Sequence, residues 1–288
     1  MNYCEQPLVF SVADEQSLGI AALPEISGDC GVLIAVGGPQ YRVGSHRQFL
    51  LLSRRLATEG YPVFRFDYRG MGDGDGAMRS FENVSEDIGT AIDTFQKLCP
   101  GLRSIVLWGL CDAASAILMY VQTTHDDRLK GLVLLNPWVR SEASLAQTHI
   151  KHYYGQRLLQ REFWLKLLTG KLRLLDSARE FLGNARKARR SPEKAEKALS
   201  FQDRMAEGLR QFGGNVLLIL SDEDYTAREF LEYSSSDAAW SGLIDAGNVC
   251  RIDVPDADHT FSTKELRARV EEETLRWLAN HQTLPKPR

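Results

Sequence analysis

The sequence predicts a doubly wound, mostly parallel α/β sheet that a helical insertion interrupts late in the chain. Short apolar runs of strand length alternate with segments of helical periodicity. The runs are continuously apolar, as expected of strands covered on both faces, and strand–helix alternation is typical of a parallel sheet. Some 70 residues between 140 and 210 contain no credible strand, and this gap marks the insertion.

The individual elements follow from these apolar runs and their spacing. Two N-terminal segments, Leu8 to Val12 and Leu18 to Leu23, predict an antiparallel hairpin at one edge of the sheet. Six further runs predict the other strands, at 31–37, 61–67, 104–108, 131–136, 216–221 and 249–254. Apolar residues at helical spacing predict helices at 47–59, 84–98, 113–122 and 263–280.

The insertion differs from the rest of the chain in charge as well as in pattern. Residues 151–210 contain 15 Lys and Arg against 7 Asp and Glu, a net charge of +8, so the remainder carries −11 to give the overall −3. Such a contrast marks a separate structural unit. We therefore expect an α/β core formed by 1–139 and 211–288, with a helical cap at 140–210.

Composition and motifs exclude several classes of protein. The start of the chain, residues 1–6, has no basic, apolar leader, and no apolar run reaches the roughly 18 residues of a membrane span. Five cysteines without a CxxC pair indicate neither a disulfide framework nor a zinc site. The glycines of 69–76 match no nucleotide-binding motif, and no nucleic-acid motif occurs. We expect a cytoplasmic protein without metal, cofactor or nucleic-acid partner, and its oligomeric state stays open.

The stretch Gly109-Leu110-Cys111-Asp112-Ala113 lies between a predicted strand and a predicted helix. It corresponds to G-x-S-x-G, in which the nucleophile occupies a sharp turn and small neighbours let helix and strand approach closely. Cysteine stands in place of serine, and alanine in place of the last glycine. Free amide groups and the dipole at a helix N-terminus favour the thiolate. We predict that Cys111 is a nucleophile; the alternative is a small buried apolar residue.

A carboxylate and a histidine follow Cys111 in the chain order of the α/β-hydrolase fold. Asp222 and Asp224 come after the strand at 216–221, and His259 comes after the last strand. The acid belongs a few residues past its strand, which favours Asp224 over Asp222. The alternative for each residue is a charged or polar side chain in a solvent-exposed loop, without a catalytic role. The sequence thus predicts a triad of Cys111, Asp224 and His259.

An acyl-transfer enzyme also needs donors for the oxyanion that develops on the carbonyl oxygen. The backbone N–H of Asp112, directly after the nucleophile, is one candidate. The loop after the first central strand supplies the other; Pro39 has no N–H, so Gly38 is preferred and Gln40 is the fallback. The alternative for this loop is a tight turn without a role.

A substrate pocket is predicted in the cap. The segment 156–175 mixes apolar and basic residues at helical spacing. Phe163, Trp164 and Leu167, together with Gln40, could line an acyl pocket. The alternatives are an ordinary cap helix and a basic amphipathic surface for a membrane or an acidic partner. A charge of +8 would also attract an anionic acyl carrier.

Five motifs in this chain resemble the exosortase A system-associated hydrolase 1 family. They are "GGPQYRVGSHRQF" (37–49), "RFDYRGMGDGDG" (65–76), "WGLCDAAS" (108–115), "YYGQRLLQREFWLKLLTGK" (153–171) and "DHTFST" (258–263). The resemblance covers nearly the whole chain and implies an α/β-hydrolase fold with the triad on Cys111, Asp224 and His259. It also implies a link to bacterial exopolysaccharide and protein-sorting systems. Gly74 departs from the family's small polar residue at that turn.

These residues together predict an enzyme that acts on a carboxylic ester or thioester of a small-molecule or carrier-bound acyl substrate. The acyl group would be held on Cys111 and then passed to water. Two alternatives stay open. The acceptor could be a sugar or a carrier, or the fold could serve as a non-catalytic binding or scaffold protein of the same system.

Overall fold

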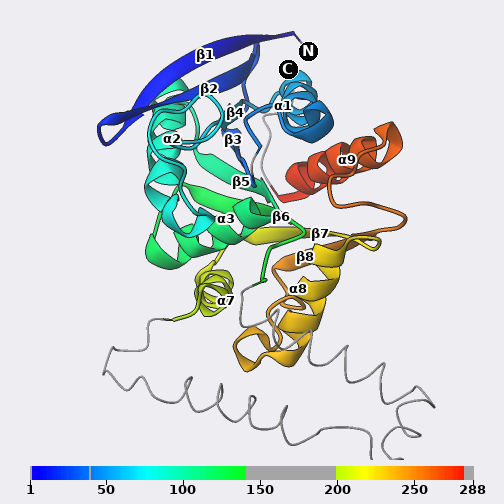
Figure 1. Cartoon of the computed structure of the whole chain (residues 1–288). Coiled ribbons are helices and arrows are strands. Elements are labelled where there is room, and N and C mark those ends of the chain that lie inside the picture. The colour runs from blue at the N-terminus through cyan, green and yellow to red at the C-terminus, as the bar shows by residue number, and fades with distance from the viewer. Residues whose placement is uncertain (1, 39, 141–198, 282–288) are drawn as a thin grey trace, which may run out of the picture. The chain divides into compact units, whose positions relative to one another are not determined.

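The computed structural model describes residues 2–38, 40–140 and 199–281. Within these ranges the chain forms a sheet of eight strands in the order β1-β2-β4-β3-β5-β6-β7-β8 (Figure 1). The strands are β1 (Tyr3–Val12), β2 (Glu15–Pro24), β3 (Cys30–Ala35), β4 (Val63–Phe66), β5 (Ser104–Leu110), β6 (Leu129–Leu135), β7 (Asn215–Ser221) and β8 (Val249–Val254). The strands from β4 to β8 pair in parallel, whereas β1 pairs with β2, and β2 with β4, antiparallel.

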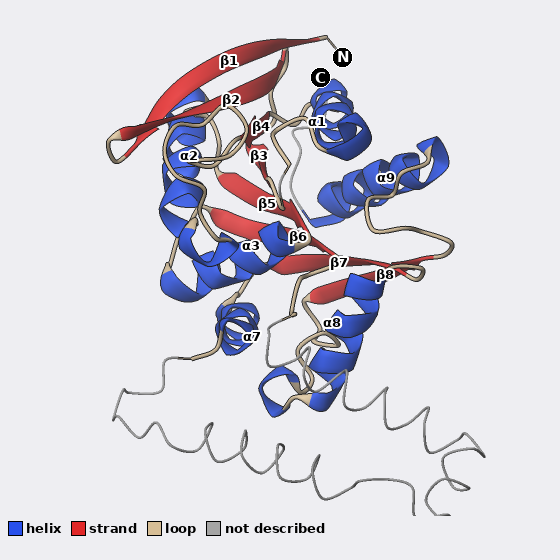
Figure 2. Cartoon of the chain, in the orientation of Figure 1, coloured by secondary structure: helices blue, strands red, loops and turns tan. Residues whose placement is uncertain are grey.

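The described helices cover both faces of this sheet (Figure 2). The α-helices are α1 (Gln48–Thr58), α2 (Ser85–Leu98), α3 (Asp112–Thr123), α7 (Phe201–Gln211), α8 (Tyr225–Ser236) and α9 (Lys264–His281). Short 3-10 turns are η1 (Ser45–Arg47), η2 (Phe81–Asn83) and η3 (Ala238–Trp240). One apolar cluster joins α2, α3, α7 and α8 to the sheet, and a second joins α1 and α9 to its other face.

Alternation of side chains along β5 explains why the strand is apolar throughout. Leu107 belongs to the cluster beneath α2 and α3, whereas Val106 and Trp108 belong to the cluster beneath α1 and α9. Trp108 is fully buried and meets Phe49 of α1 edge to face, with 5.6 Å between ring centroids. A strand buried on both faces needs apolar residues at every position.

The predicted doubly wound, mostly parallel sheet is confirmed, and each predicted strand and helix is present within a few residues of its expected limits. The N-terminal hairpin is longer than predicted, with ten residues in each strand. Helix α8 was not predicted from the sequence. Most of its residues are polar, and the few buried ones, which include Ala227 and Phe230, give too short an apolar pattern to indicate a helix.

Most of the predicted cap, 140–210, lies outside the described residues. The chain's first compact unit comprises Met1–Val139 and Ser200–Arg288, so α7 belongs to the core and not to the insertion. Close packing against α3 explains this, because a Cβ at Gly208 would meet the Leu118 carbonyl oxygen at 2.0 Å. The Gln202 amide also donates to the Val139 carbonyl at 3.0 Å. This bond joins the point where the chain leaves the first unit to the point where it returns.

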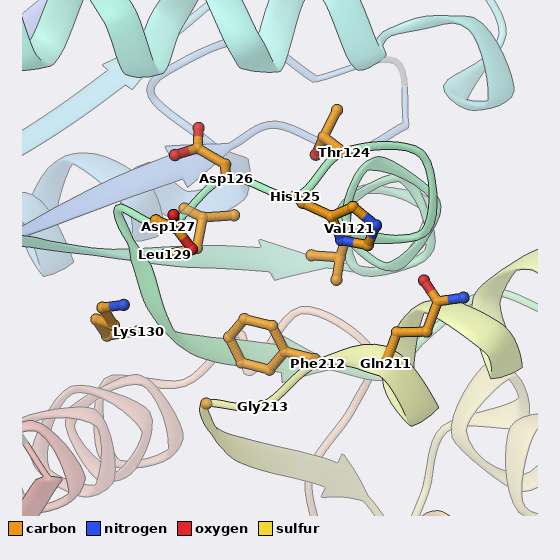
Figure 3. A pocket seen from close by; sticks show the side chains of 11 residues that line it. Val121, Thr124, His125, Asp126, Asp127, Leu129, Lys130, Gln211, Phe212 and Gly213 are labelled. Carbon is orange, nitrogen blue, oxygen red and sulfur yellow. The ribbon is translucent and has the colours of Figure 1, made fainter.

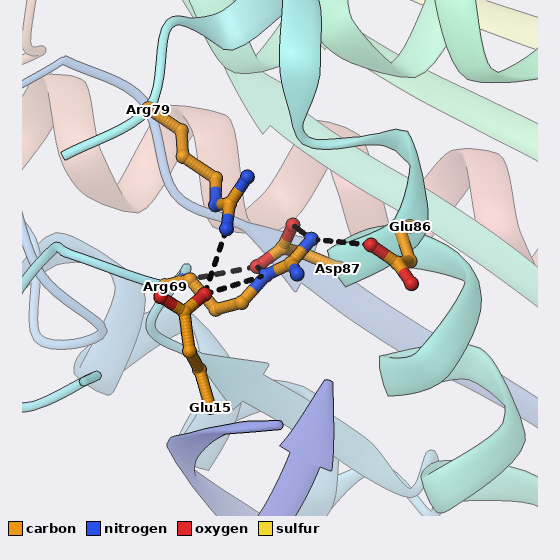
Figure 4. Close-up of polar contacts among 5 residues, drawn as sticks. All are labelled: Glu15, Arg69, Arg79, Glu86 and Asp87. Carbon is orange, nitrogen blue, oxygen red and sulfur yellow. Dashed lines mark hydrogen bonds and ion pairs between the residues drawn. The ribbon is translucent and has the colours of Figure 1, made fainter. Parts of the chain in front are cut away.

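A buried ion pair anchors the segment between β4 and α2 (Figure 4). The Arg69 guanidinium donates to both carboxylate oxygens of Asp87, at 3.0 and 2.9 Å, and to Glu86 at 2.7 Å. Glu15 of β2 accepts from Arg79 at 2.7 Å and lies 3.8 Å from Arg69. The cluster therefore ties the start of α2 to the hairpin and fixes the loop that carries Arg79.

None of the helices in the described part of the chain is long and apolar enough to cross a membrane.

We expect the Asp87→Ala substitution to lower the free energy of unfolding by about 3–5 kcal/mol, because it leaves the buried Arg69 charge without its main partner. The Asp87 side chain is fully buried, whereas that of Glu86 is 61 % exposed. Glu86→Gln is the matched control and should cost less than about 1 kcal/mol. Urea denaturation measures both values. Equal losses in the two variants would contradict this account.

Candidate active site

Cys111 occupies the sharp turn between β5 and α3, as the motif predicts. Its backbone has φ 63° and ψ −126°, a conformation that residues with a side chain rarely adopt. Backbone hydrogen bonds hold it: the Cys111 N–H donates to Leu135 at 2.8 Å, and its carbonyl accepts from Ala114 at 3.0 Å. A Cβ at Gly109 would lie 2.7 Å from Ile117, so glycine is required where α3 approaches β5.

Asp224 and His259 are brought together at the same edge of the sheet. The His259 Nδ1 lies 2.7 Å from the Asp224 Oδ2. Asp224 is 6 % exposed and is the N-cap of α8, where its carboxylate accepts from the amides of Thr226 and Ala227 at 3.1 and 3.2 Å. Asp222 is exposed, and its carbonyl accepts from Arg228. The contact to His259 therefore comes from Asp224 and not from Asp222.

The environment of His259 favours its protonated form. Hydrogen bonding to Asp224, followed by hydrogen bonding to Cys111, raises the pKa of His259 to about 10, although burial opposes the rise. Because Nδ1 contacts Asp224, Nε2 is the ring nitrogen left to face the thiol. The three side chains thus form a connected series at the carboxyl ends of β5, β7 and β8.

Asn136 supports this series and was not predicted as a site residue. It is fully buried at the end of β6, and its amide donates to the Ser221 hydroxyl at 2.8 Å and to the His259 carbonyl at 3.3 Å. Ser221 in turn donates to the Asp258 carbonyl at 3.0 Å. The sequence signal is a single amide that ends the apolar run 131–136. This bridge fixes the loop that carries His259.

The predicted oxyanion donors are adjacent but are already occupied. Gly38 has φ 61°, and its N–H donates to the Asp112 Oδ1 at 2.5 Å. The amides of Ala113 and of Asp112 itself also hydrogen-bond this carboxylate. Burial nevertheless raises the pKa of Asp112. The fallback donor, Gln40, holds its own loop, because its side-chain oxygen accepts from Ser45 at 2.9 Å.

A mostly apolar cavity of about 270 Å³ adjoins Gly38 and Asp112. It lies between the start of α3, the loop after β4 and η2, and its apolar lining includes Tyr68, Met71, Met78, Phe81, Val84 and Ala116. None of these residues was predicted from the sequence as part of a pocket. Tyr68, Met71, Met78 and Phe81 come from segments without a regular period, whereas Val84 and Ala116 belong to predicted helices whose pattern does not show which cavity they line. The pocket residues predicted in the cap, Phe163, Trp164 and Leu167, lie outside the described residues.

A second pocket lies at the opposite edge of the sheet (Figure 3). Its volume is about 310 Å³, and it is lined by the α3–β6 connection with His125 and Asp126 and by the α7–β7 connection with Phe212. Parallel α/β sheets bind ligands at the carboxyl ends of their strands. This pocket lies at the amino ends of β6 and β7, so we place the active site at Cys111 instead.

The part of the chain that the structure describes contains no group of three or more His, Cys, Asp or Glu side chains arranged to hold a metal ion.

Comparison with known proteins identifies the class. The family model "Serine aminopeptidase, S33" matches residues 42–216, more than half of the chain. The chain therefore belongs to this family of α/β hydrolases. The family is named for a serine, whereas Cys111 stands at the corresponding motif position here.

Solved structures share the α/β-hydrolase fold at low sequence identity. The α/β hydrolase GrgF from Penicillium sp. sh18 is 13% identical, with 96% of this chain and 99% of that chain covered and a TM-score of 0.64. The Pyrococcus furiosus esterase Pf2001 is 15% identical, with 98% and 92% covered and a TM-score of 0.64. A dienelactone hydrolase from Anabaena variabilis is 12% identical, with 97% and 98% covered and a TM-score of 0.61. No curated protein matches the chain.

We expect Asp224→Asn to lower the pKa of His259 from about 10 by at least about one pH unit, because the largest cause of the rise is lost. Asp222→Asn, the matched control, should leave that pKa unchanged. NMR titration of the His259 ring measures both. An equal fall in the two variants would contradict the assignment of the partner.

The same raised pKa predicts how stability depends on pH. Protonated His259 is favoured in the folded state, so its contribution is fully present below about pH 6.5 and is lost as the pH rises through about 10. The unfolding free energies of wild type and His259→Asn should therefore differ more at pH 6 than at pH 10. A difference that grows with pH would contradict this sign.

Proposed function

We propose that the chain hydrolyses carboxylic esters or thioesters through a covalent acyl-enzyme on Cys111. The observation that carries this proposal is the connected series of Cys111, His259 and Asp224 at the carboxyl edge of the sheet. A nucleophile, a base within reach of it and a group that orients the base are the parts that acyl transfer requires.

The high pKa of His259 determines the order of the proton transfers. At neutral pH the raised pKa keeps the His259 ring protonated, so the ring has a proton to give. In this scheme Cys111 attacks as the thiolate. The sulfur attacks the carbonyl carbon and forms a C–S bond, while the carbonyl oxygen becomes an oxyanion. As the oxyanion re-forms the carbonyl, the bond to the leaving group breaks and His259 protonates the leaving alkoxide or thiolate. Water then attacks the acyl-cysteine; neutral His259 takes its proton, and the thiolate leaves.

The leaving group limits the substrate class. A thiolate is itself a good leaving group, so a tetrahedral intermediate on Cys111 returns to reactants unless the substrate's own leaving group departs readily. Activated esters and thioesters satisfy this condition better than amides do. We therefore favour them over the peptides to which the family name refers.

The acyl group would occupy the apolar cavity beside Gly38 and Asp112. Its lining is predominantly apolar, and its position next to the backbone amides suits a carbonyl whose oxygen points toward them. The resemblance to exosortase-associated hydrolases further suggests an acyl substrate from exopolysaccharide or protein-sorting systems. We propose that the protein acts on it in the cytoplasm. Transfer to a sugar hydroxyl in place of water would follow the same steps.

We expect a nitrophenyl ester or an acyl thioester to acylate the protein on Cys111, as measured by intact mass. Cys111→Ala should abolish the adduct and lower kcat/KM by at least about a thousandfold. His259→Ala should lower turnover by about 10²–10⁴-fold, because proton transfer is lost.

Cys250→Ala provides the matched control, since this thiol on β8 is free and exposed. It should keep both the adduct and the turnover. An adduct that survives in Cys111→Ala, or the absence of acylation and turnover with a series of short- and long-chain acyl donors, would contradict the proposed function. The second outcome would favour a binding role.

A further inference from the structure

The amides that should stabilise an oxyanion already bind an anion of the protein itself. The carboxylate of Asp112 accepts from the N–H of Gly38 at 2.5 Å. It also accepts from the amides of Ala113 and Asp112 at the start of α3. Gly38 and Asp112 are the oxyanion donors predicted from the sequence, so the side chain next to the proposed nucleophile already occupies them.

Two negative charges cannot share these donors. A hydrogen bond between an amide and a charged acceptor is stronger than one with a neutral carbonyl oxygen. The Asp112 carboxylate therefore competes with the substrate carbonyl, and it would repel the oxyanion that forms after attack by Cys111. Reaction on Cys111 requires the carboxylate to leave the amides.

The cavity beside Asp112 contains a hydroxyl that could receive this carboxylate. Tyr68 lines the same cavity, is 3 % exposed, and its hydroxyl has no hydrogen-bond partner among the described residues. A buried hydroxyl without a partner is costly in a folded protein and calls for an explanation. Burial, with a contribution from the Asp112 charge, holds the pKa of the Tyr68 phenol well above its usual value, so it stays a proton donor.

Two other polar side chains line this cavity, and each already has a contact. Arg79 pairs with Glu15 through its Nη2 (Figure 4), although its Nε–H is buried without a partner among the described residues. Ser80 is exposed, and its hydroxyl caps η2, where it accepts from the Glu82 amide at 3.3 Å. Tyr68 is the buried hydroxyl of this cavity that has no partner among the described residues, so we take it as the donor for a carboxylate displaced into the cavity.

We propose that substrate displaces the Asp112 carboxylate from the oxyanion-binding amides and that the Tyr68 hydroxyl then receives it. Asp112 and Tyr68 are positioning residues in this scheme: the first reserves the oxyanion site, and the second lowers the cost of emptying it. The inference rests on the proposed function, because it assumes that an oxyanion forms next to Cys111.

The test uses two probes of Cys111 on the full chain. An alkyl trifluoromethyl ketone adds to the thiolate and forms an oxyanion, whereas iodoacetamide alkylates the thiolate without forming one. We expect Asp112→Ala to bind the ketone at least about tenfold more tightly, because the competing anion is gone. The alkylation rate should change much less. Asp112→Asn, which keeps the shape but not the charge, should show a smaller gain in the same direction.

Tyr68→Phe tests the second position of the carboxylate. We expect it to weaken ketone binding in the wild-type background and to have no effect in the Asp112→Ala background. A residue that only packed in the cavity would act equally in both backgrounds. Asp127→Asn, at an exposed aspartate in the second pocket, is the control for removal of a charge and should change neither probe.

The outcomes separate this inference from the proposed function. Weaker or unchanged ketone binding in both Asp112→Ala and Asp112→Asn, with thermal unfolding showing that both are folded, would overturn the displacement. A Tyr68→Phe effect that persists in Asp112→Ala would overturn the role of Tyr68. If neither the ketone nor the acyl donors form an adduct on Cys111, in the wild type or in either Asp112 variant, the proposed function itself would be overturned.

Discussion

The site depends on the backbone of Cys111, which is held at a positive φ between β5 and α3. This conformation costs on the order of 1–3 kcal/mol, and the surrounding packing has to supply that free energy. The buried strand β5 on one side and the tightly packed helix α3 on the other leave the chain no room to relax. As a result Cys111 and the first residue of α3, Asp112, are held together at the carboxyl end of β5. The proposed nucleophile and one of the proposed oxyanion donors are thus fixed by a single turn.

The parallel sheet brings the other two parts to this turn. Strands that run in one direction end at one edge, so the loops after β7 and β8 reach Cys111 from neighbouring positions in the sheet. Two sets of contacts orient the Asp224 carboxylate, because it caps the N-terminus of α8 and also contacts His259. The helix cap is therefore not separate from the chemistry of the site. Asn136 performs the equivalent task for the His259 loop from inside the core.

The sequence predicted the elements whose pattern is local. Continuous apolar runs identified the strands, and the strand–turn–helix motif identified the place of Cys111. Asp224 and His259 could be found because the fold dictates their order and their position after a strand. The link between the Asp112 side chain and Gly38 could not be predicted, since it joins residues 74 positions apart and depends on a rotamer. The cavity lining escaped for a related reason: Tyr68 and Phe81 come from irregular segments, where neither period nor motif exists. The end of the insertion was predicted at residue 210, whereas the compact core begins again at Ser200. The prediction missed this because the sequence of α7, like that of the insertion before it, has a helical pattern and no strand pattern.

The hydrogen bond between Gln202 and Val139 means that the polypeptide leaves the core and re-enters it at nearly the same point. Evolution can lengthen, shorten or replace such an excursion without moving β6 away from β7, because the two exit points remain joined. The entropic cost of closing it grows only as the logarithm of its length, so even a large replacement changes folding little. The segment between these two points can thus vary while the turn at Cys111 stays as it is.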